Sequence, residues 1–449
     1  MFIFCSKANK VKIVLFLCLV FVSIIYAQEN RIVANSESNY FQVDSIQIIG
    51  NEKTENFIIL RELSFTIGDT VNNKMLHFNR ERIFSLGIFT KVNITIEKYK
   101  EKNIVSILIE ESWYIFPVPF VNVREKSLEQ TSYGVSLKFK NIRGRNETIR
   151  ATISLGYDPF FSLEYENPLI ISAFDLNMFF SFAYGKSVNK SEILESIYGE
   201  TFDFNSMSLN TMWGKRFGEK TNLFLIFSYS KIKVPSNKLN SFMSSGSSID
   251  EKISTGISYL YDSRNLKQYA SNGEVFELSY SYNGLLNSNN FNAINLDMRK
   301  YREIYNSFIV KGRFTARHTF GKFVPIYDYS MLGYDYYVRG NRYELREGNN
   351  RILANLELSY PILSEWNFAI ELPILPNSLT RARISIIAGL FADAGTIFNN
   401  TDRIRINNFN TGYGFGLTFL LLPYSSFRIE YALNEFGKGE VLFATGISF

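Results

Sequence analysis

The sequence contains only two cysteines, Cys5 and Cys18, and both lie within residues 1–27. If that segment is removed, the remaining chain has no thiol, which excludes disulfides, cysteine metal sites and cysteine nucleophiles. Histidine is equally scarce, because His77 and His318 are the only two and lie far apart in the sequence. No phosphate-binding loop or nucleophile elbow is present. We therefore expect a protein that is not an enzyme and that uses no metal or cofactor.

Long hydrophobic runs are also missing beyond the N-terminus, whereas a transmembrane helix needs about 20 consecutive apolar residues. The mean hydropathy is only −0.05. Aromatic residues nevertheless make up 16% of the chain, with 41 Phe and 27 Tyr, and the net charge is a mild +5. That charge is too small to favour a nucleic-acid partner. Many large rings without long apolar runs favour alternating membrane strands with aromatic girdles.

The N-terminus has the pattern of a secretory signal. Lys7, Lys10 and Lys12 precede an apolar stretch over 13–25, and a cleavage point fits between Ala27 and Gln28. This pattern predicts a signal peptide over 1–27 and a flexible polar lead-in over 28–40. A membrane anchor is the alternative, although the apolar stretch is short for one.

Residues 41–111 have the pattern of a small α/β unit with the order strand, helix, helix, strand, strand. A first strand ends near Gly50, and a helix is expected over 54–63. After the break at Gly68, Asn72 or Asn73 can cap a second helix, which Gly87 closes. Alternating apolar residues then predict two strands, one over 92–96 and one over 105–109.

This order resembles a POTRA domain, a periplasmic polypeptide-transport module. The residues that carry the resemblance are Gly50, Gly68, Gly87 and Phe89 with their immediate neighbours. The resemblance implies that client strands add to an exposed edge of the small sheet. An inert spacer domain is the alternative. One such unit fits before Trp113.

From residue 112 to 449 the pattern changes to period two. Residues 176–184, 276–282 and 427–433, for example, alternate apolar and polar side chains, and Gly, Asn and Ser clusters separate such runs. About sixteen runs predict an antiparallel transmembrane β-barrel, closed because an open edge in hydrocarbon leaves backbone groups unpaired. Tandem soluble β-sandwiches are the alternative, but they would not place so many rings on one face. The first strand is expected over 113–123 and the last over 441–449.

Two short stretches of this region supply opposite charges, one an arginine and the other a carboxylate. Arg339 precedes Gly340, and Asp393 lies on an alternating strand whose apolar partners face lipid. The same parity points Glu357, on the preceding strand, into the lumen. A buried arginine needs such partners, and its planar fork suits a bidentate carboxylate. We predict that Arg339 folds back into the barrel and pairs with Asp393, with Glu357 nearby.

An ordered set of motifs resembles the BamA/TamA superfamily of outer-membrane assembly proteins, also called bacterial surface antigens. The family's loop tip is matched by 338–340, although Asn341 stands where an aromatic residue is usual. The other matching motifs are 141–146, 165–168, 261–265 with 272–273, and 391–395. Phe449, at the end of an alternating strand, resembles the sorting signal of outer-membrane barrels. The resemblance implies a bacterial outer-membrane protein with its POTRA domain in the periplasm.

The resemblance also implies a function, the insertion or translocation of other polypeptides. The expected partners are unfolded outer-membrane or secreted polypeptides and the lipid bilayer, with periplasmic chaperones or assembly lipoproteins as further candidates. We expect a lateral seam between the first and last strands, weakened by Gly446 and ending at Phe449. Two alternatives stay open: a dedicated exporter of one secreted partner, and a passive porin-like or structural barrel. The sequence also leaves open whether the Arg339 cluster is a static brace or part of a gate.

Overall fold

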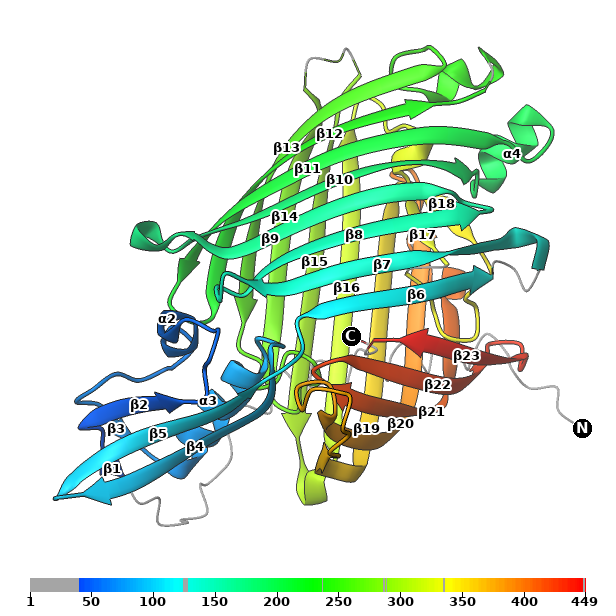
Figure 1. Cartoon of the computed structure of the whole chain (residues 1–449). Coiled ribbons are helices and arrows are strands. Elements are labelled where there is room, and N and C mark those ends of the chain that lie inside the picture. The colour runs from blue at the N-terminus through cyan, green and yellow to red at the C-terminus, as the bar shows by residue number, and fades with distance from the viewer. Residues whose placement is uncertain are drawn as a thin grey trace, which may run out of the picture.

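The computed structural model describes residues 40–449 except 124–127, 236, 286, 288, 334–335 and 447–448. The predicted signal peptide over 1–27 and the lead-in up to residue 39 lie outside the described residues. The described chain consists of a small α/β domain followed by a 16-stranded antiparallel sheet that curls into a barrel (Figure 1). This architecture confirms the predicted fold class. Within the described part of the chain, no helix is long and apolar enough to cross a membrane.

The small domain is a three-stranded sheet with two helices. Its central strand, β5, pairs in parallel with β2 and antiparallel with β4. A further two-stranded pair, β1 with β3, was not predicted. The elements are β1 (Phe41–Gln42), β2 (Ser45–Ile49), α2 (Asn56–Leu60), β3 (Thr70–Val71), α3 (Asn73–Phe84), β4 (Phe89–Tyr99) and β5 (Lys102–Glu111).

Local chemistry sets the ends of the two helices. The side chain of Asn72 caps α3 by accepting a hydrogen bond from the backbone N–H of Met75 at 2.9 Å. Helix α2 is shorter than the predicted 54–63. Its start is delayed because the Glu111 carboxylate accepts hydrogen bonds from the backbone N–H and the hydroxyl of Thr54, at 2.7 and 2.6 Å. Thr54 is thereby held outside the helix.

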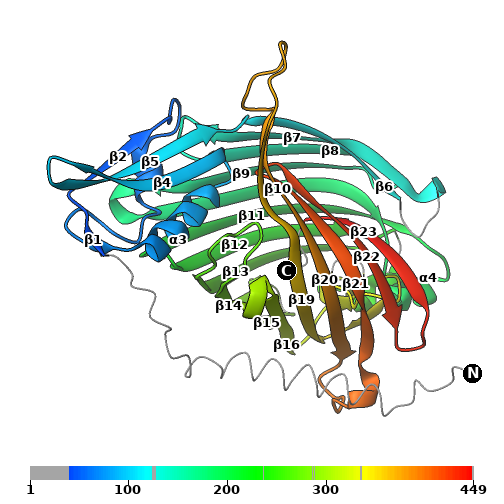
Figure 2. The ribbon, with the colours of Figure 1, turned by 90° about the horizontal axis from the view of Figure 1, so that it is seen from below.

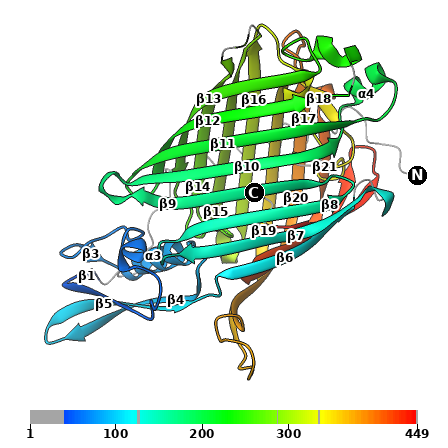
Figure 3. The ribbon, with the colours of Figure 1, turned by 45° about the horizontal axis from the view of Figure 1, so that its top comes forward.

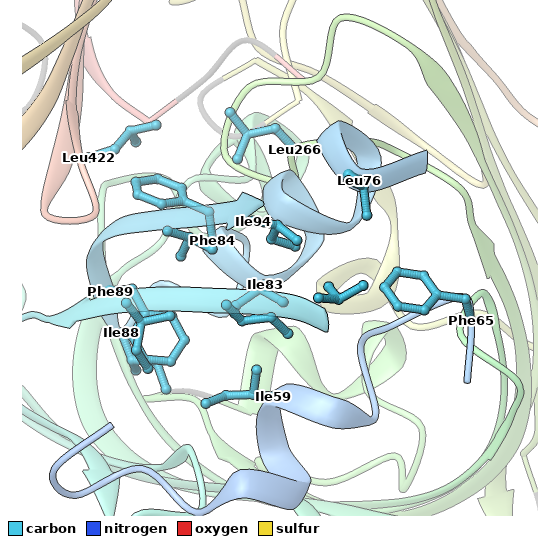
Figure 4. Packing of buried hydrophobic residues seen from close by; sticks show 14 of the residues in the cluster. Ile59, Phe65, Leu76, Ile83, Phe84, Ile88, Phe89, Ile94, Leu266 and Leu422 are labelled. Atoms are coloured by element: carbon cyan, nitrogen blue, oxygen red, sulfur yellow. The ribbon is translucent and has the colours of Figure 1, made fainter. Parts of the chain in front are cut away.

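The core of the small domain continues into the barrel. Ile83 and Phe84 of α3 pack with Phe89 of β4, and the same buried cluster includes Leu266 and Leu422 of the barrel. Figure 4 shows Leu266 and Leu422 beside Phe84 and Leu76 of α3. Seen from below, the domain lies at one side of the barrel opening, and the β19–β20 hairpin projects past the wall (Figure 2). The apolar cluster thus joins domain and barrel.

Neighbouring strands of the barrel pair in sequence order, and the connection from β16 to β19 carries a separate short pair, β17 with β18. Helix α4 (Glu192–Tyr198) lies between β10 and β11. The strands are β6 (Ile115–Val123), β7 (Thr131–Ile142), β8 (Glu147–Gly156), β9 (Phe160–Ile171), β10 (Leu176–Val188), β11 (Asp203–Phe217), β12 (Thr221–Lys233), β13 (Ile249–Asp262), β14 (Gly273–Leu285), β15 (Phe291–Glu303), β16 (Ile309–Gly321), β17 (Ser330–Leu332), β18 (Arg346–Gly348), β19 (Asn350–Ala369), β20 (Arg381–Phe398), β21 (Asn410–Leu422), β22 (Ser425–Asn434) and β23 (Gly439–Thr445).

The two ends of the sheet, β6 and β23, face each other, as Figures 1 and 3 show. They form no strand pair within the described residues. The prediction that the last strand continues to Phe449 is wrong, because β23 ends at Thr445. Gly446 has a φ of +88°, a left-handed conformation that ends the extended strand. Phe449 is buried against Tyr301 of β15, with ring centroids 6.4 Å apart.

Candidate functional site

The connection between β16 and β19 folds into the barrel and carries the candidate site. Val338 is buried with Leu332 of β17 and Leu353 of β19 in a small apolar cluster. Its neighbour Arg339 has only 4% of its surface exposed. The apolar cluster therefore anchors the loop at the point where the guanidinium enters the lumen.

The Arg339 guanidinium forms a two-pronged contact with Asp393. Its Nε donates to Oδ2 and its Nη2 donates to Oδ1, both at 2.8 Å, and the Arg339 backbone N–H donates to Oδ2 at 3.1 Å. Nη1 donates to Glu430 at 2.9 Å and lies 3.5 Å from Glu357. The fork geometry of arginine explains how one side chain links β19, β20 and β22.

Strand register places the acids around this arginine. On β20, Asp393 lies opposite Asn355 of β19 and opposite Gly412 of β21. Phe391, two residues before Asp393, points to the same side, and the Arg339 guanidinium lies 3.7 Å from its ring centre. This distance is within cation–π range. The Arg339 guanidinium therefore packs on the face of the Phe391 ring in addition to pairing with carboxylates.

The carboxylates around Arg339 have further cationic partners. Lys311 contacts Glu357 at 3.0 Å, and Arg428 contacts Glu430 at 3.3 Å. The hydroxyl of Ser359 donates to Glu357 at 2.7 Å. Because buried charge is costly unless paired, this shared pairing keeps the cluster close to neutral. The partners Glu430, Lys311 and Arg428 were not predicted. The only signal for Glu430 is its place on the polar face of an alternating strand.

Glycines make room for the loop. Gly340 has a φ of +94°, and a Cβ on it would lie 2.9 Å from the carbonyl carbon of Leu433. A Cβ on Gly412 would overlap the carbonyl oxygen of Arg339. Asn341, the departure from the family motif, is buried and donates to the Thr411 carbonyl at 3.1 Å and to Glu435 at 2.9 Å. Amide contacts therefore hold this position of the loop.

The predicted POTRA residues lie together in the small domain and apart from the Arg339 cluster. Gly50, Gly68 and Gly87 have φ values of +93°, +99° and +69°, which favour glycine at all three turns. Gly68 also donates its N–H to the Val43 carbonyl at 2.8 Å. Phe89 is fully buried at the start of β4. These residues set the shape of the domain, and the structure does not bring them to the lumen.

An ionic contact between the small domain and the barrel was missed by the sequence reasoning. Glu62 lies between Arg216 of β11, at 2.6 Å, and Arg82 of α3, at 2.8 Å. Arg383 of β20 contacts Glu81 of α3 at 2.9 Å. Burial by itself raises the pKa of Glu62, but the two arginines outweigh burial and hold that pKa below its usual value. No local sequence pattern predicts these ion pairs, because the two residues of each pair lie far apart in the chain.

The predicted seam residues do not lie together. Gly446 follows β23, and its N–H donates to the Ser426 carbonyl of β22 at 2.9 Å. Phe449 packs on the inward-facing side of β14 and β15, far around the wall from β6. Only Gly446 therefore lies next to the unpaired edge of β23.

Comparisons with known proteins agree with this architecture. Residues 141–449 match the model of the Omp85 superfamily domain, and residues 41–112 match a POTRA model described as a surface antigen variable number repeat. The fold is similar to that of BamA from Haemophilus ducreyi lacking POTRA domains 1–3, with 15% identity, a TM-score of 0.52, and coverage of 91% of this chain and 84% of that one.

The fold is also similar to that of CdiB from Escherichia coli. The identity is 11%, the TM-score is 0.50, and the match covers 98% of this chain and 96% of that one. A search of the curated proteins finds no match. At these identities the solved structures show a shared fold, and the match over 141–449 carries the family assignment.

Proposed function

We propose that this chain, which belongs to the Omp85 superfamily, inserts unfolded polypeptides into the outer membrane through the seam between β6 and β23. Proteins of this superfamily are non-enzymatic barrels that insert or translocate polypeptides. They lie in the bacterial outer membrane with POTRA domains in the periplasm. The proposal takes 41–111 as the client-receiving domain and 112–449 as the barrel.

The unpaired seam is the observation that carries the proposal. In hydrocarbon, every backbone N–H and C=O needs a partner, so barrels that only conduct are closed. Here the sheet order ends at β6 on one side and β23 on the other. An incoming strand can satisfy the exposed backbone groups, and each strand added to a growing sheet offers a new edge.

The small domain has a suitable edge for receiving clients. In its sheet β5 is central, β4 faces β20 of the barrel, and β2 is the remaining edge. Extended peptides bind such edges through backbone hydrogen bonds, and this mode of binding tolerates many peptide sequences. We propose that β2 (Ser45–Ile49) collects an unfolded client and delivers it to the seam.

The Arg339 cluster supports a role in holding the wall while the seam opens. Its ionic contacts reach β19, β20 and β22, which lie on the β23 side of the sheet. In this proposal the infolded loop keeps those strands as one body. A passive porin, in contrast, needs neither two unpaired sheet ends nor a small domain packed against its barrel.

Depletion of the protein followed by quantitative proteomics of the outer membrane tests the proposal. A fall in many barrel proteins supports general assembly. Loss of one or a few exported proteins instead supports a dedicated exporter, which is the second candidate. No change in any outer-membrane or secreted protein contradicts both and favours a structural barrel. A disulfide engineered between β6 and β23 is expected to block insertion, and continued insertion by that locked barrel contradicts the seam route.

A further inference from the structure

We infer that the two edges of the seam are chemically different and that an incoming client strand pairs with β23 rather than with β6. This inference rests on the proposed function, since it requires that clients enter at the seam. It goes beyond that function by naming the edge that acts as the template. The evidence is the set of backbone groups that each edge strand turns toward the seam.

On β6, prolines occupy two neighbouring seam-facing positions in the middle of the strand. The N–H of Lys140 donates to the Tyr114 carbonyl at 2.7 Å, which fixes the phase of the β6–β7 ladder. Hydrogen-bonded and non-hydrogen-bonded pairs alternate in an antiparallel ladder. In the observed register, the backbone groups of Pro117 and Pro119 therefore point away from β7, toward the seam. Proline has no N–H, so the middle of this edge accepts hydrogen bonds but donates none.

On β23, the corresponding edge is complete. The N–H of Gly446 donates to Ser426 at 2.9 Å, and the N–H of Asn434 donates to the Lys438 carbonyl at 3.0 Å. Both bonds assign the even-numbered residues to the β22 ladder. The odd-numbered residues therefore face the seam, and each has an N–H to donate. They are Gly439, Val441, Phe443 and Thr445.

The difference decides which edge is the better template inside a membrane. A strand paired with β6 would leave its own carbonyls without donors opposite Pro117 and Pro119, in surroundings with no water to replace them. A strand paired with β23 finds both a donor and an acceptor at every seam-facing residue. Edge prolines are a known device against strand addition. The two prolines also limit how firmly β6 can close on β23, so the seam stays easy to open.

The direction of the strands then identifies the client segment. β6 begins next to the periplasmic domain and runs away from it, so β23, at the other end of an even-numbered antiparallel sheet, runs back toward the periplasm. A strand added antiparallel to β23 runs away from the periplasm. In a client barrel with both ends in the periplasm, that strand is the first one.

Cross-linking in the reconstituted full-length chain tests this assignment. The variants carry Cys5→Ser and Cys18→Ser together with either Val118→Cys on β6 or Ala444→Cys on β23. The backbone groups of Val118 point toward β7 and those of Ala444 toward β22. Each residue would therefore form a non-hydrogen-bonded pair with a strand added at the seam, with Cα atoms about 4.5 Å apart. The probe is an unfolded eight-stranded outer-membrane barrel with one cysteine in its first or its last strand.

We expect the Ala444→Cys variant to cross-link to the first strand of the probe at least tenfold more than the Val118→Cys variant cross-links to either strand. Dominant cross-linking to Val118→Cys overturns the inference but leaves the seam route standing. If the probe inserts without cross-linking at either edge, the seam route itself is overturned. In a Pro117→Val/Pro119→Val background, cross-linking at Val118→Cys is expected to rise, because the missing donors are restored.

Two matched proline substitutions provide a second measurement. Val121 on β6 and Phe443 on β23 are 70% and 69% exposed, and both turn their N–H groups toward the seam. Neither N–H bonds to the adjacent strand, so both variants should keep the heat-dependent gel mobility of a folded barrel. We expect Phe443→Pro to slow insertion of the probe at least tenfold and Val121→Pro to slow it less than twofold. The reverse order overturns the inference.

Discussion

The Arg339 guanidinium and the Asp393 carboxylate share two hydrogen bonds of 2.8 Å, although the residues are 54 positions apart in the sequence. Asp393 is fully buried and Arg339 nearly so. Because both charges are removed from water, deleting Arg339 would leave Asp393 without its cation, and deleting Asp393 would leave Arg339 with only Glu430 and Glu357 as anionic partners. The pair therefore fixes the infolded loop to the wall.

Replacing Arg339 by alanine is expected to destabilise the barrel by about 3–5 kcal/mol, the usual cost of breaking a buried ion pair. The variant leaves Asp393 and Glu430 without their shared cation. The expected result is a lower temperature for the loss of the compact, heat-modifiable form on gels. Arg339→Lys should be intermediate, because an ammonium keeps the charge but not the fork.

Arg342→Ala is the matched control, because Arg342 lies on the same loop and its guanidinium lies over the rings of Tyr337 and Tyr343. It should leave the unfolding temperature nearly unchanged. Equal losses from Arg339→Ala and Arg342→Ala would show that the cluster does not hold the loop.

Gly412→Ala tests whether the loop needs the space that the missing side chain of Gly412 leaves on the lumen side of β21. Its new methyl group would overlap the Arg339 carbonyl oxygen, so the loop tip has to move. We expect faster cleavage of the loop by protease added to intact cells. Gly389→Ala is the control, since a Cβ there meets Glu357 at an ordinary 3.5 Å. Similar cleavage rates for the two variants would contradict the close fit.

Much of this arrangement can be predicted from sequence by counting alternate residues. Parity alone turns Glu357 and Asp393 into the lumen, and the observed register places both on inward-facing positions. Parity does not say how far a long side chain reaches. Glu430 lies on the polar face of its strand, yet only the folded loop shows that Arg339 extends to β22.

Other features depend on contacts that no local pattern records. The Glu62 contact with Arg216 joins the small domain to a strand 154 residues away. The path of Phe449 was predicted wrongly, because an alternating run gives no warning that Gly446 takes a left-handed conformation and ends the strand. Sequence periodicity describes strands well and the junctions between them poorly.

Phe89→Ala is expected to unfold the small domain while the barrel stays folded. Phe89 is fully buried where β4 begins, and removal of a buried Phe side chain typically costs about 3–5 kcal/mol. Limited proteolysis should then remove the domain and leave a resistant barrel fragment. Tyr99→Ala, at the exposed end of the same strand, should leave the protease pattern unchanged. A resistant domain in Phe89→Ala would mean that docking on the barrel compensates for the lost core contact.

Docking of the small domain should weaken in acid because of Glu62. Arg216 and Arg82 hold the pKa of this carboxyl below its usual value despite burial. A group with a lowered folded-state pKa stabilises the folded form above its unfolded pKa, about 4.3, and loses that contribution as the pH falls through its folded pKa. The docked state is therefore expected to be stable at pH 7 and to loosen below about pH 4.3.

Spin labels on Lys98→Cys in β4 and Glu303→Cys at the end of β15 would report this change as a broader distance distribution at low pH. Glu62→Gln should give the broad distribution already at pH 7, since it leaves Arg82 and Arg216 without their shared anion. Glu52→Gln, at an exposed position of the same domain, should behave like the parent chain. A narrow distribution in Glu62→Gln at every pH would mean that the apolar contacts of Leu266 and Leu422 hold the domain without the ion pairs.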